Sequence, residues 1–321
     1  MKSVSELTDF YYKNLYPTLE ELEVLRKNLR DRILVVGVIY TTAFIVILFS
    51  FISIESITID ALIFLFFAYV AIGAFIYKFL TKNYTSDFKS RVIKPLIHAI
   101  DKNLSYFSDS HVSLATFEKS KLFTSSIDKY SGNDFVKGRV DGIDIKFSDV
   151  YAQKREKNSQ NFNNYSTIFR GLFIVSEFNK TFHGETVVLP DSAQNTFGNL
   201  IGNWLQSNNF ARDELVKMDD VEFEKEFVVY STDQIEARYI LSHALMEKLL
   251  ILKKRSKHPL YISFIGANIH IAIEYDKDLF EPSIFNSLLK YRVAMEYIET
   301  LYLSLGIVRE LKLNQRLWSK R

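Results

Sequence analysis

Cysteine is missing from this chain of 321 residues. Disulfide bonds, thiol nucleophiles and zinc–thiolate sites are therefore excluded. A strong excess of one charge is missing too, because 40 basic residues nearly balance 38 acidic residues and leave a formal net charge of +2. Proteins that bind nucleic acid usually carry a basic patch. The charge balance therefore predicts no nucleic acid partner.

Signatures of known catalytic sites are missing as well. The sequence contains no Gly-Lys-Ser/Thr phosphate loop, no Gly-x-Ser-x-Gly nucleophile elbow and no kinase signature. The 6 histidines do not have the spacing of metal ligands, and the acidic run 213–226 lacks the pattern of an EF-hand calcium loop. We therefore expect no cofactor and no metal, and the sequence identifies no catalytic residue.

Two long apolar runs near the N-terminus are the most informative feature that is present. They cover Ile33–Ile54 and Ile59–Leu80. A helix rises about 1.5 Å per residue, so about 20 residues cross a hydrocarbon core about 30 Å thick. Buried core helices are rarely apolar all round over this length, and a cleaved signal peptide begins closer to the first residue. The runs predict transmembrane helices at 33–54 and 59–80.

Basic residues on either side of these runs predict their orientation. The loop between the runs contains Glu55 and no Lys or Arg. Lysines and arginines accumulate on the cytoplasmic side of a membrane. We therefore expect a multi-pass protein of the bacterial inner (cytoplasmic) membrane with both termini cytoplasmic. The basic residues that flank the runs are Arg26, Lys27, Arg30 and Arg32 before the first, and Lys78, Lys82, Lys89, Arg91 and Lys94 after the second.

The segments that flank the spans have apolar residues at helical spacing. They predict a cytoplasmic juxtamembrane helix at 1–32, which Pro17 can start, and a stalk helix at 81–104, which Pro95 should kink or interrupt. The apolar faces of these helices can pack on each other or, with the transmembrane helices, form a homo-oligomer. The sequence leaves both arrangements open.

The remaining residues, 105–321, predict a cytoplasmic α+β domain in which an antiparallel sheet packs on helices; the pattern leaves open whether this region is one domain or two. Asp141-Gly142 separates two alternating runs and is a strong hairpin signal. Ser231 is expected to cap a helix that runs to about Lys254, and Ser283 a last helix at about 284–305. The expected strands are 135–140, 143–147, 167–178, 181–189, 223–230, 260–265 and 268–275.

Several stretches together resemble a known family. They are Tyr16-Pro17-Thr18-Leu19-Glu20-Glu21-Leu22, Gly138-Arg139-Val140-Asp141-Gly142, Ile168-Phe169-Arg170-Gly171-Leu172-Phe173, the segment Phe223–Leu241, Phe280-Glu281-Pro282, and Leu313-Asn314 near Trp318. The chain thereby resembles, over nearly its full length, the bacterial membrane-protein family of unknown function often mislabelled "galanin", the domain of unknown function thirty-one thirty-seven. The family has no established activity, so the resemblance implies no catalytic residue. Similar proteins are often encoded beside members of the LemA family of membrane proteins, which implies a LemA-like partner in a shared envelope process.

Two groups of residues are candidate contact sites. Asp233, Glu236 and Arg238 fall in the first turn of an expected helix, where Arg238 either captures a ligand or forms a structural salt bridge. The basic tail combines cations with a tryptophan, as interfacial helices do, so it either contacts the membrane surface or serves solubility. Its residues are Arg309, Lys312, Arg316 and Trp318.

These features favour a membrane-anchored, non-enzymatic binding or scaffold module, whose cytoplasmic domain engages a protein or lipid partner. The alternative is a membrane-tethered enzyme of the hydrolase type, with an Asp/Glu/His/Arg site assembled by folding.

Overall fold

The computed structural model describes residues 4–52, 58–156, 164–177, 181–191, 215–276, 278–290, 292, 295–302 and 304–306. The chain forms two compact units. One unit contains Met1–Leu7, Ile97–Phe280 and Tyr297–Arg321, and the other contains Thr8–Leu96 with Glu281–Glu296. A segment near the C-terminus therefore belongs to the same unit as the N-terminal helices. The domain ranges expected from the sequence stay predictions.

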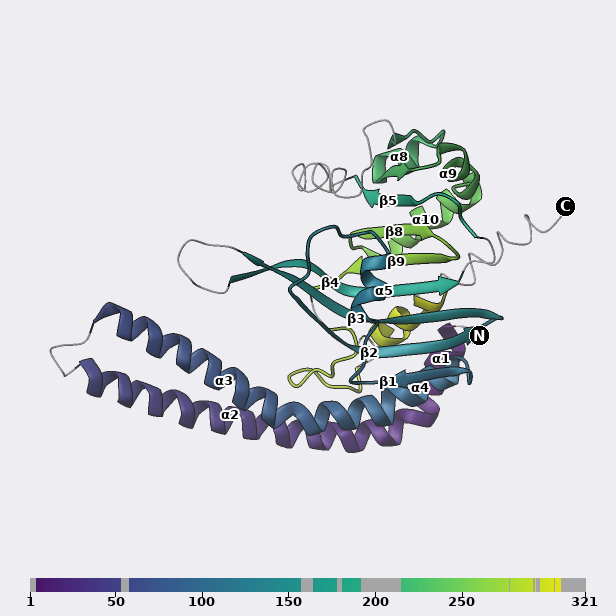
Figure 1. Cartoon of the computed structure of the whole chain (residues 1–321). Coiled ribbons are helices and arrows are strands. Elements are labelled where there is room, and N and C mark those ends of the chain that lie inside the picture. Colours follow the sequence, from purple (N-terminus) through teal and green to yellow (C-terminus); the bar gives the residue numbers. More distant parts are fainter. Residues whose placement is uncertain are drawn as a thin grey trace. The chain divides into compact units, whose positions relative to one another are not determined.

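Two long antiparallel helical arms make up most of the helical unit (Figure 1). The first arm runs through α1 (Val4–Phe10), the π-helical turn η1 (Tyr11–Leu15) and α2 (Tyr16–Ile52). The second runs through α3 (Ile59–Phe88), the π-helical turn η2 (Lys89–Ile93) and α4 (Lys94–Ile100). Thr58 caps α3 by accepting a hydrogen bond from the Ala61 N–H.

The predicted pair of long apolar helices is confirmed. Both arms are long and apolar enough to cross a membrane, and no residue of their most apolar 18-residue windows is buried. The helices touch through aromatic side chains in this region: the Tyr40 hydroxyl donates to the Tyr69 carbonyl at 2.7 Å, and the two rings stack 4.8 Å apart.

The polar halves of the two arms bury one stripe each. Leu19, Leu22 and Arg26 are buried on α2, and Tyr84 and Phe88 on α3. Leu25, which shares the helical spacing, is 44% exposed. The helical spacing admits either Leu25 or Arg26 at this position of the stripe, and the structure buries Arg26.

Both arms contain a π-helical turn that ends two residues before a proline. Proline lacks an N–H and its ring clashes with the carbonyl four residues earlier. For Pro17 and Pro95 these carbonyls belong to Lys13 in η1 and Arg91 in η2, where the wider π turn makes room. The expectation that Pro17 starts a helix is wrong, because the helix begins at Val4. Pro95 perturbs the helix through η2 but does not end it.

A sheet of nine strands dominates the other unit, in the order β1-β2-β3-β4-β9-β8-β5-β7-β6, and every neighbouring pair is antiparallel. The α+β fold predicted from the sequence is confirmed. The strands are β1 (Leu104–Phe107), β2 (Lys129–Val140), β3 (Ile143–Glu156), β4 (Asn164–Glu177), β5 (Thr186–Pro190), β6 (Leu215–Val216), β7 (Phe227–Ser231), β8 (Leu260–Ile265) and β9 (Asn268–Glu274).

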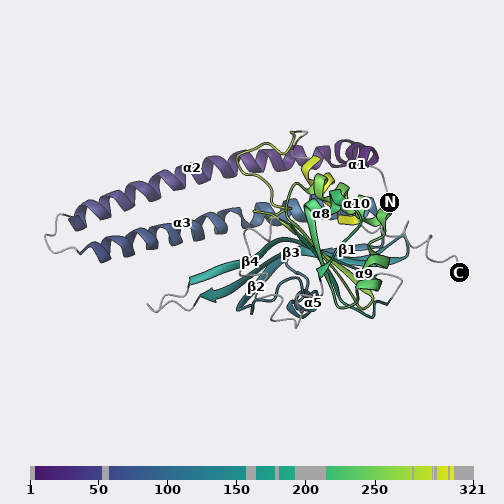
Figure 2. The ribbon, with the colours of Figure 1, turned by 90° about the horizontal axis from the view of Figure 1, so that it is seen from above.

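Helices cover both faces of this sheet. The short helix α5 (Leu114–Lys119) lies on one face and α10 (His243–Ser256) on the other (Figures 1 and 2). Under α5, the buried Phe117 contacts the Phe173 ring of β4 at a centroid distance of 4.9 Å. Strands that are covered on both faces lose the alternation of polar and apolar residues. Consistent with this, every residue of β8 is buried.

The hairpin predicted at Asp141-Gly142 is confirmed, and the expected strands 260–265 and 268–275 also form a hairpin. Asp141 and Gly142 have φ of 50° and 84° and connect β2 to β3, as a type I′ turn requires. Gly266 and Ala267 connect β8 to β9.

Three predictions about the last third of the chain are wrong. The expected strand at 223–230 begins as helix α8 (Val221–Glu226) and becomes β7 only at Phe227. The single helix expected up to Lys254 is divided into α9 (Gln234–Ile240) and α10, because the chain breaks at Leu241-Ser242. The last helix was expected at about 284–305, but residues 284–290 are not helical. The described helical residues near this end are 292, 295–302 and 304–306.

Candidate functional site

The predicted residues Asp233 and Glu236 fix the start of α9. Asp233, not the expected Ser231, is the N-cap, and its carboxylate accepts hydrogen bonds from the Ile235 and Glu236 N–H groups at 2.9 Å. The Glu236 carboxylate accepts from the Gly184 N–H at 2.7 Å and from the His183 N–H. Glu236 thereby ties α9 to the segment that leads into β5.

Further contacts strengthen this junction. The Glu185 N–H donates to the Thr232 hydroxyl at 2.9 Å, and a Cβ added at Gly184 would lie 2.9 Å from the Cβ of Asp233. The two acidic side chains therefore have structural partners in the fold, and α9 is held at a defined position.

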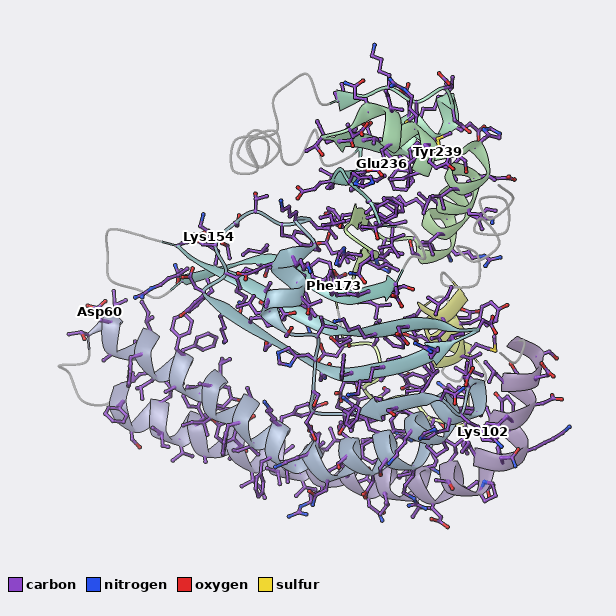
Figure 3. The ribbon with its side chains drawn as sticks, turned by 45° about the vertical axis from the view of Figure 1, so that its right-hand side comes forward. Asp60, Lys102, Lys154, Phe173, Glu236 and Tyr239 are labelled. Carbon is purple, nitrogen blue, oxygen red and sulfur yellow. The ribbon has the colours of Figure 1, made fainter. Side chains whose placement is uncertain are left out.

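The outer face of α9 carries Ile235, Arg238 and Tyr239. Ile235 is 82% exposed and Tyr239 is 54% exposed, and Figure 3 shows Tyr239 and Glu236 on this helix. Arg238 is also exposed and forms no ion pair with any residue that the structure describes. Of the two interpretations offered by the sequence, the structural salt bridge is not observed in this part of the chain.

The other predicted group cannot be placed. Arg309, Lys312, Arg316 and Trp318 lie outside the described residues. Among the residues that are described, no three His, Asp or Glu side chains gather closely enough to hold a metal ion.

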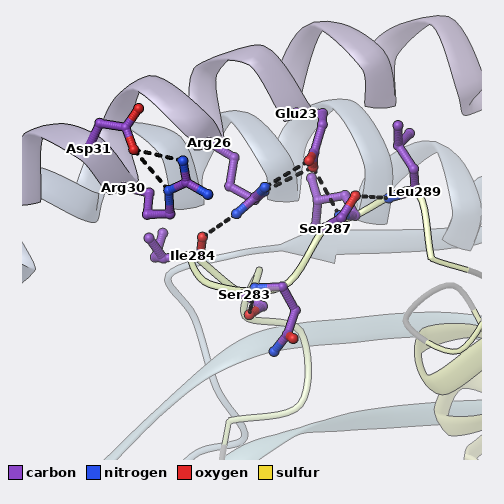
Figure 4. A network of polar contacts seen from close by, with 10 residues as sticks. Glu23, Arg26, Arg30, Asp31, Ser283, Ile284, Ser287 and Leu289 are labelled. Carbon is purple, nitrogen blue, oxygen red and sulfur yellow. Dashed lines mark hydrogen bonds and ion pairs between the residues drawn. The ribbon is translucent and has the colours of Figure 1, made fainter. Parts of the chain in front are cut away.

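Sequence reasoning missed a buried polar network in the helical unit (Figure 4). The Arg26 guanidinium donates two hydrogen bonds to the Glu23 carboxylate, at 2.9 and 2.7 Å, and a third to the Ile284 carbonyl at 2.5 Å. The Glu23 carboxylate also accepts from the Leu288 N–H at 3.1 Å. Both side chains are almost fully buried. The network therefore holds residues 284–288 against α2.

Electrostatics keeps both members of this network charged. Burial works to raise the pKa of Glu23, but hydrogen bonds from Arg26 and from the Leu288 N–H outweigh it and lower that pKa below its ordinary value. The hydrogen bond to Glu23 raises the pKa of Arg26. The signal available in the sequence was the polar residue at a stripe position of an amphipathic helix.

Other contacts hold the same segment to both helical arms. The Lys89 ammonium forms an ion pair with Glu281 at 2.7 Å, and Lys89 itself is buried. The Tyr11 hydroxyl contacts the Leu288 carbonyl at 3.4 Å. Residues 281–290, which we call the strap, therefore make polar contacts with α2, η1 and η2.

Comparison with known proteins matches part of this chain to a family. No curated protein matches the chain. A solved structure, the mycobacterial trehalose monomycolate transport factor A, TtfA, is 7% identical over 68% of this chain and 91% of that chain, with a TM-score of 0.29. A likeness at that score carries no argument about function. The model of the family described as "Protein of unknown function (DUF3137)" matches residues 167–313, which confirms the resemblance expected from the sequence over that stretch.

Proposed function

We propose that this chain is a membrane-anchored, non-enzymatic binding module: α2 and α3 fix it in the bacterial inner membrane, and the sheet unit engages a partner in the cytoplasm. The exposure of large apolar side chains along both helices carries this proposal. Exposing apolar surface to water costs about 25 cal/mol per Å², whereas a bilayer removes that cost. The exposed side chains include Val35, Ile39, Phe49, Phe64, Phe67, Phe75 and Phe79.

The outer face of α9 is the proposed partner-binding surface. Arg238 lies between Ile235 and Tyr239, and all three are exposed. Arginine and tyrosine are enriched among the residues that dominate binding energy at protein interfaces. The Asp233 cap and the Glu236 hydrogen bonds hold the helix in place before a partner arrives, which lowers the ordering cost of binding. This geometry supports a protein partner.

The identity of that partner is a finer proposal. The resemblance to the family favours a LemA-like membrane protein, and the amphipathic arms also supply surfaces for a homo-oligomer. The cytoplasmic position of both termini rests on the basic residues that flank the spans. The basic tail from Arg309 to Trp318 remains a proposed contact with the membrane surface.

The test uses the full chain, extracted from its host in native lipid discs, with mass spectrometry of everything retained. The wild type should retain one protein at a fixed stoichiometry. Arg238→Ala and Ile235→Ser should each lose it, because both remove contact groups from an exposed surface without removing a buried one.

Lys154→Ala serves as the matched control, since Lys154 is an exposed cation on β3. It should retain the partner at the wild-type level. Circular dichroism checks that every variant keeps its fold. Retention of the same partner by the α9 variants would contradict the proposed surface, and turnover of a substrate by the purified chain would contradict the non-enzymatic role.

A further inference from the structure

A hollow of about 670 Å³ opens on the sheet unit, over strands β1 to β4 and the turn between β8 and β9. It is separate from the α9 surface. The residues that matter for its chemistry are two lysines, Lys137 and Lys146, together with Asn103, Ser105 and Asn268, whose side chains can donate hydrogen bonds.

The two lysines lie directly opposite each other on neighbouring strands. Lys137 of β2 pairs in register with Lys146 of β3. Like charges at opposite positions destabilise a sheet. The Lys137 ammonium lies 5.3 Å from the centre of the Phe107 ring, and neither lysine forms an ion pair with a residue that the structure describes.

The acidic residues at this hollow do not neutralise the lysines. Arg139 engages Asp144 with two hydrogen bonds, at 2.8 and 3.1 Å. Glu177 is exposed at the end of β4 and makes no ion pair with a described residue. Neither Lys137 nor Lys146 therefore has a carboxylate counter-charge at ion-pair distance among the described residues.

A buried histidine and a further lysine, Lys119, lie beside Lys146. His270 shares its sheet face, because Val175 of β4 pairs in register with both Lys146 and His270. Burial, and then the charges of Lys146 and Lys119, lower the pKa of His270 to about 4. Burial and the charge of Lys119 also lower the pKa of Lys146. A lysine in a hollow with a perturbed pKa is a mark of functional sites.

We propose that this hollow binds a phosphate group, with Lys137 and Lys146 on either side of its oxygens. A phosphate monoester carries up to two negative charges near pH 7 and has three acceptor oxygens. One such group neutralises both lysines and accepts hydrogen bonds from Ser105, Asn103 or Asn268. A carboxylate carries one negative charge and can neutralise only one of the two lysines. The same chemistry occurs in a free phosphate and in the phosphomonoester headgroup of phosphatidic acid.

The test measures the thermal unfolding midpoint of the full chain in a neutral detergent at pH 7.5 and constant ionic strength. One series titrates inorganic phosphate; a second titrates dihexanoyl phosphatidic acid, with dihexanoyl phosphatidylcholine as its reference. The unfolding midpoint of the wild type should rise and then saturate in at least one of the two series. A rise with inorganic phosphate identifies a free phosphate ligand, and a rise only with phosphatidic acid identifies a lipid headgroup.

Lys146→Gln and Lys137→Gln should each weaken this binding at least tenfold, and Lys154→Gln, which removes an equal charge from the far end of β3, should leave it unchanged. Without ligand, Lys146→Gln should unfold at a higher midpoint than the wild type, because the cost of burying the Lys146 charge beside Lys119 is gone. If Lys146 only stabilised the fold, this substitution would lower the unfolding midpoint instead. If Lys146→Gln does not fold, the exposed Lys137 carries the test. The proposal is overturned if the unfolding midpoint shows no saturable rise in either series, or if Lys137→Gln and Lys146→Gln both bind as tightly as the wild type.

Discussion

The buried Glu23–Arg26 pair gives the sharpest prediction for a single side chain. Arg26→Ala removes three hydrogen bonds and leaves the Glu23 carboxylate buried without its counter-charge. Breaking a buried pair in this way typically costs about 3–5 kcal/mol. We expect a loss of that size in the free energy of unfolding of the full chain, measured by chemical denaturation in detergent.

The neighbouring Arg30–Asp31 pair offers a matched control. It is an Arg–carboxylate pair on the same helix, but its side chains are 39% and 62% exposed (Figure 4). Exposed pairs contribute about 0–1 kcal/mol, so Arg30→Ala should change stability little. Equal losses for the two variants would contradict the role assigned to the buried network.

His270 predicts a specific pH dependence of stability. Its pKa is lowered to about 4 in the folded chain, mainly by burial, from an ordinary value of 6.5. The unfolded chain therefore binds a proton between these values while the folded chain does not, so stability falls as the pH falls through this window. The difference corresponds to about 3 kcal/mol.

The test measures the free energy of unfolding of the wild type and of His270→Gln at pH 7 and at pH 4. Comparing the two proteins separates the effect of His270 from that of the carboxylates, which both proteins share. The variant should lose about 3 kcal/mol less than the wild type over that range. Identical pH profiles would show that His270 is not held neutral.

Individual site residues were only partly predictable from the sequence. Asp233 and Glu236 were recognisable because carboxylates favour helix starts, but their partners in the segment before β5 depend on long-range pairing. Arg26 was counted among the charges at the membrane edge, and its burial depends on the strap, which is far away in the sequence. The register that sets Lys137 against Lys146 follows from the hairpin turn, so it could have been found.

At the scale of elements, the close packing of Gly138 against β1 leads to a prediction about the β1–β2 pairing. A Cβ at this position would lie 2.2 Å from the Asn103 carbonyl oxygen, so Gly138→Ala must push β1 away from β2. The Leu104 N–H donates to Asp101, so the alternate amides of β1, those of Ser105 and Phe107, face β2. We expect hydrogen exchange at these two amides to accelerate at least tenfold, measured by mass spectrometry.

Gly142→Ala is the control for that experiment. Nothing lies within 4 Å of a Cβ at Gly142, although its φ of 84° is unfavourable for alanine. It should destabilise the β2–β3 turn and leave the protection of β1 unchanged. Faster exchange throughout the sheet in both variants would contradict a local role for Gly138.

Local signals decided which elements the sequence revealed. The Asp141-Gly142 turn and the apolar helices were predicted because short-range chemistry determines them. The break at Leu241-Ser242 was missed because Leu241 and Leu245 continue the helical spacing on both sides of it. The strap was mistaken for a helix at 284–290, since its polar contacts with α2 replace the hydrogen bonds that a helix would make.

At the scale of the whole molecule, the chain order does not follow the units. The chain leaves the helical unit after Leu96, builds the sheet and returns to the helical unit with the strap at Glu281. Segments at both ends of the sheet unit are therefore tied to the proposed membrane anchor. This return was invisible to the sequence, because it requires contacts between residues about as far apart as Glu23 and Leu288.

Cysteine mapping tests the central claim, that the chain crosses the inner membrane with its sheet unit in the cytoplasm, most directly. The natural chain has no cysteine, so Asp60→Cys and Lys154→Cys each introduce a single thiol. Asp60 is exposed at the start of α3, and Lys154 is exposed on β3. A membrane-impermeant maleimide is applied to cells with a permeabilised outer membrane, before and after lysis of the inner membrane. The account predicts labelling of Asp60→Cys before lysis and of Lys154→Cys only afterwards; labelling of both thiols before lysis, or of neither, would contradict it.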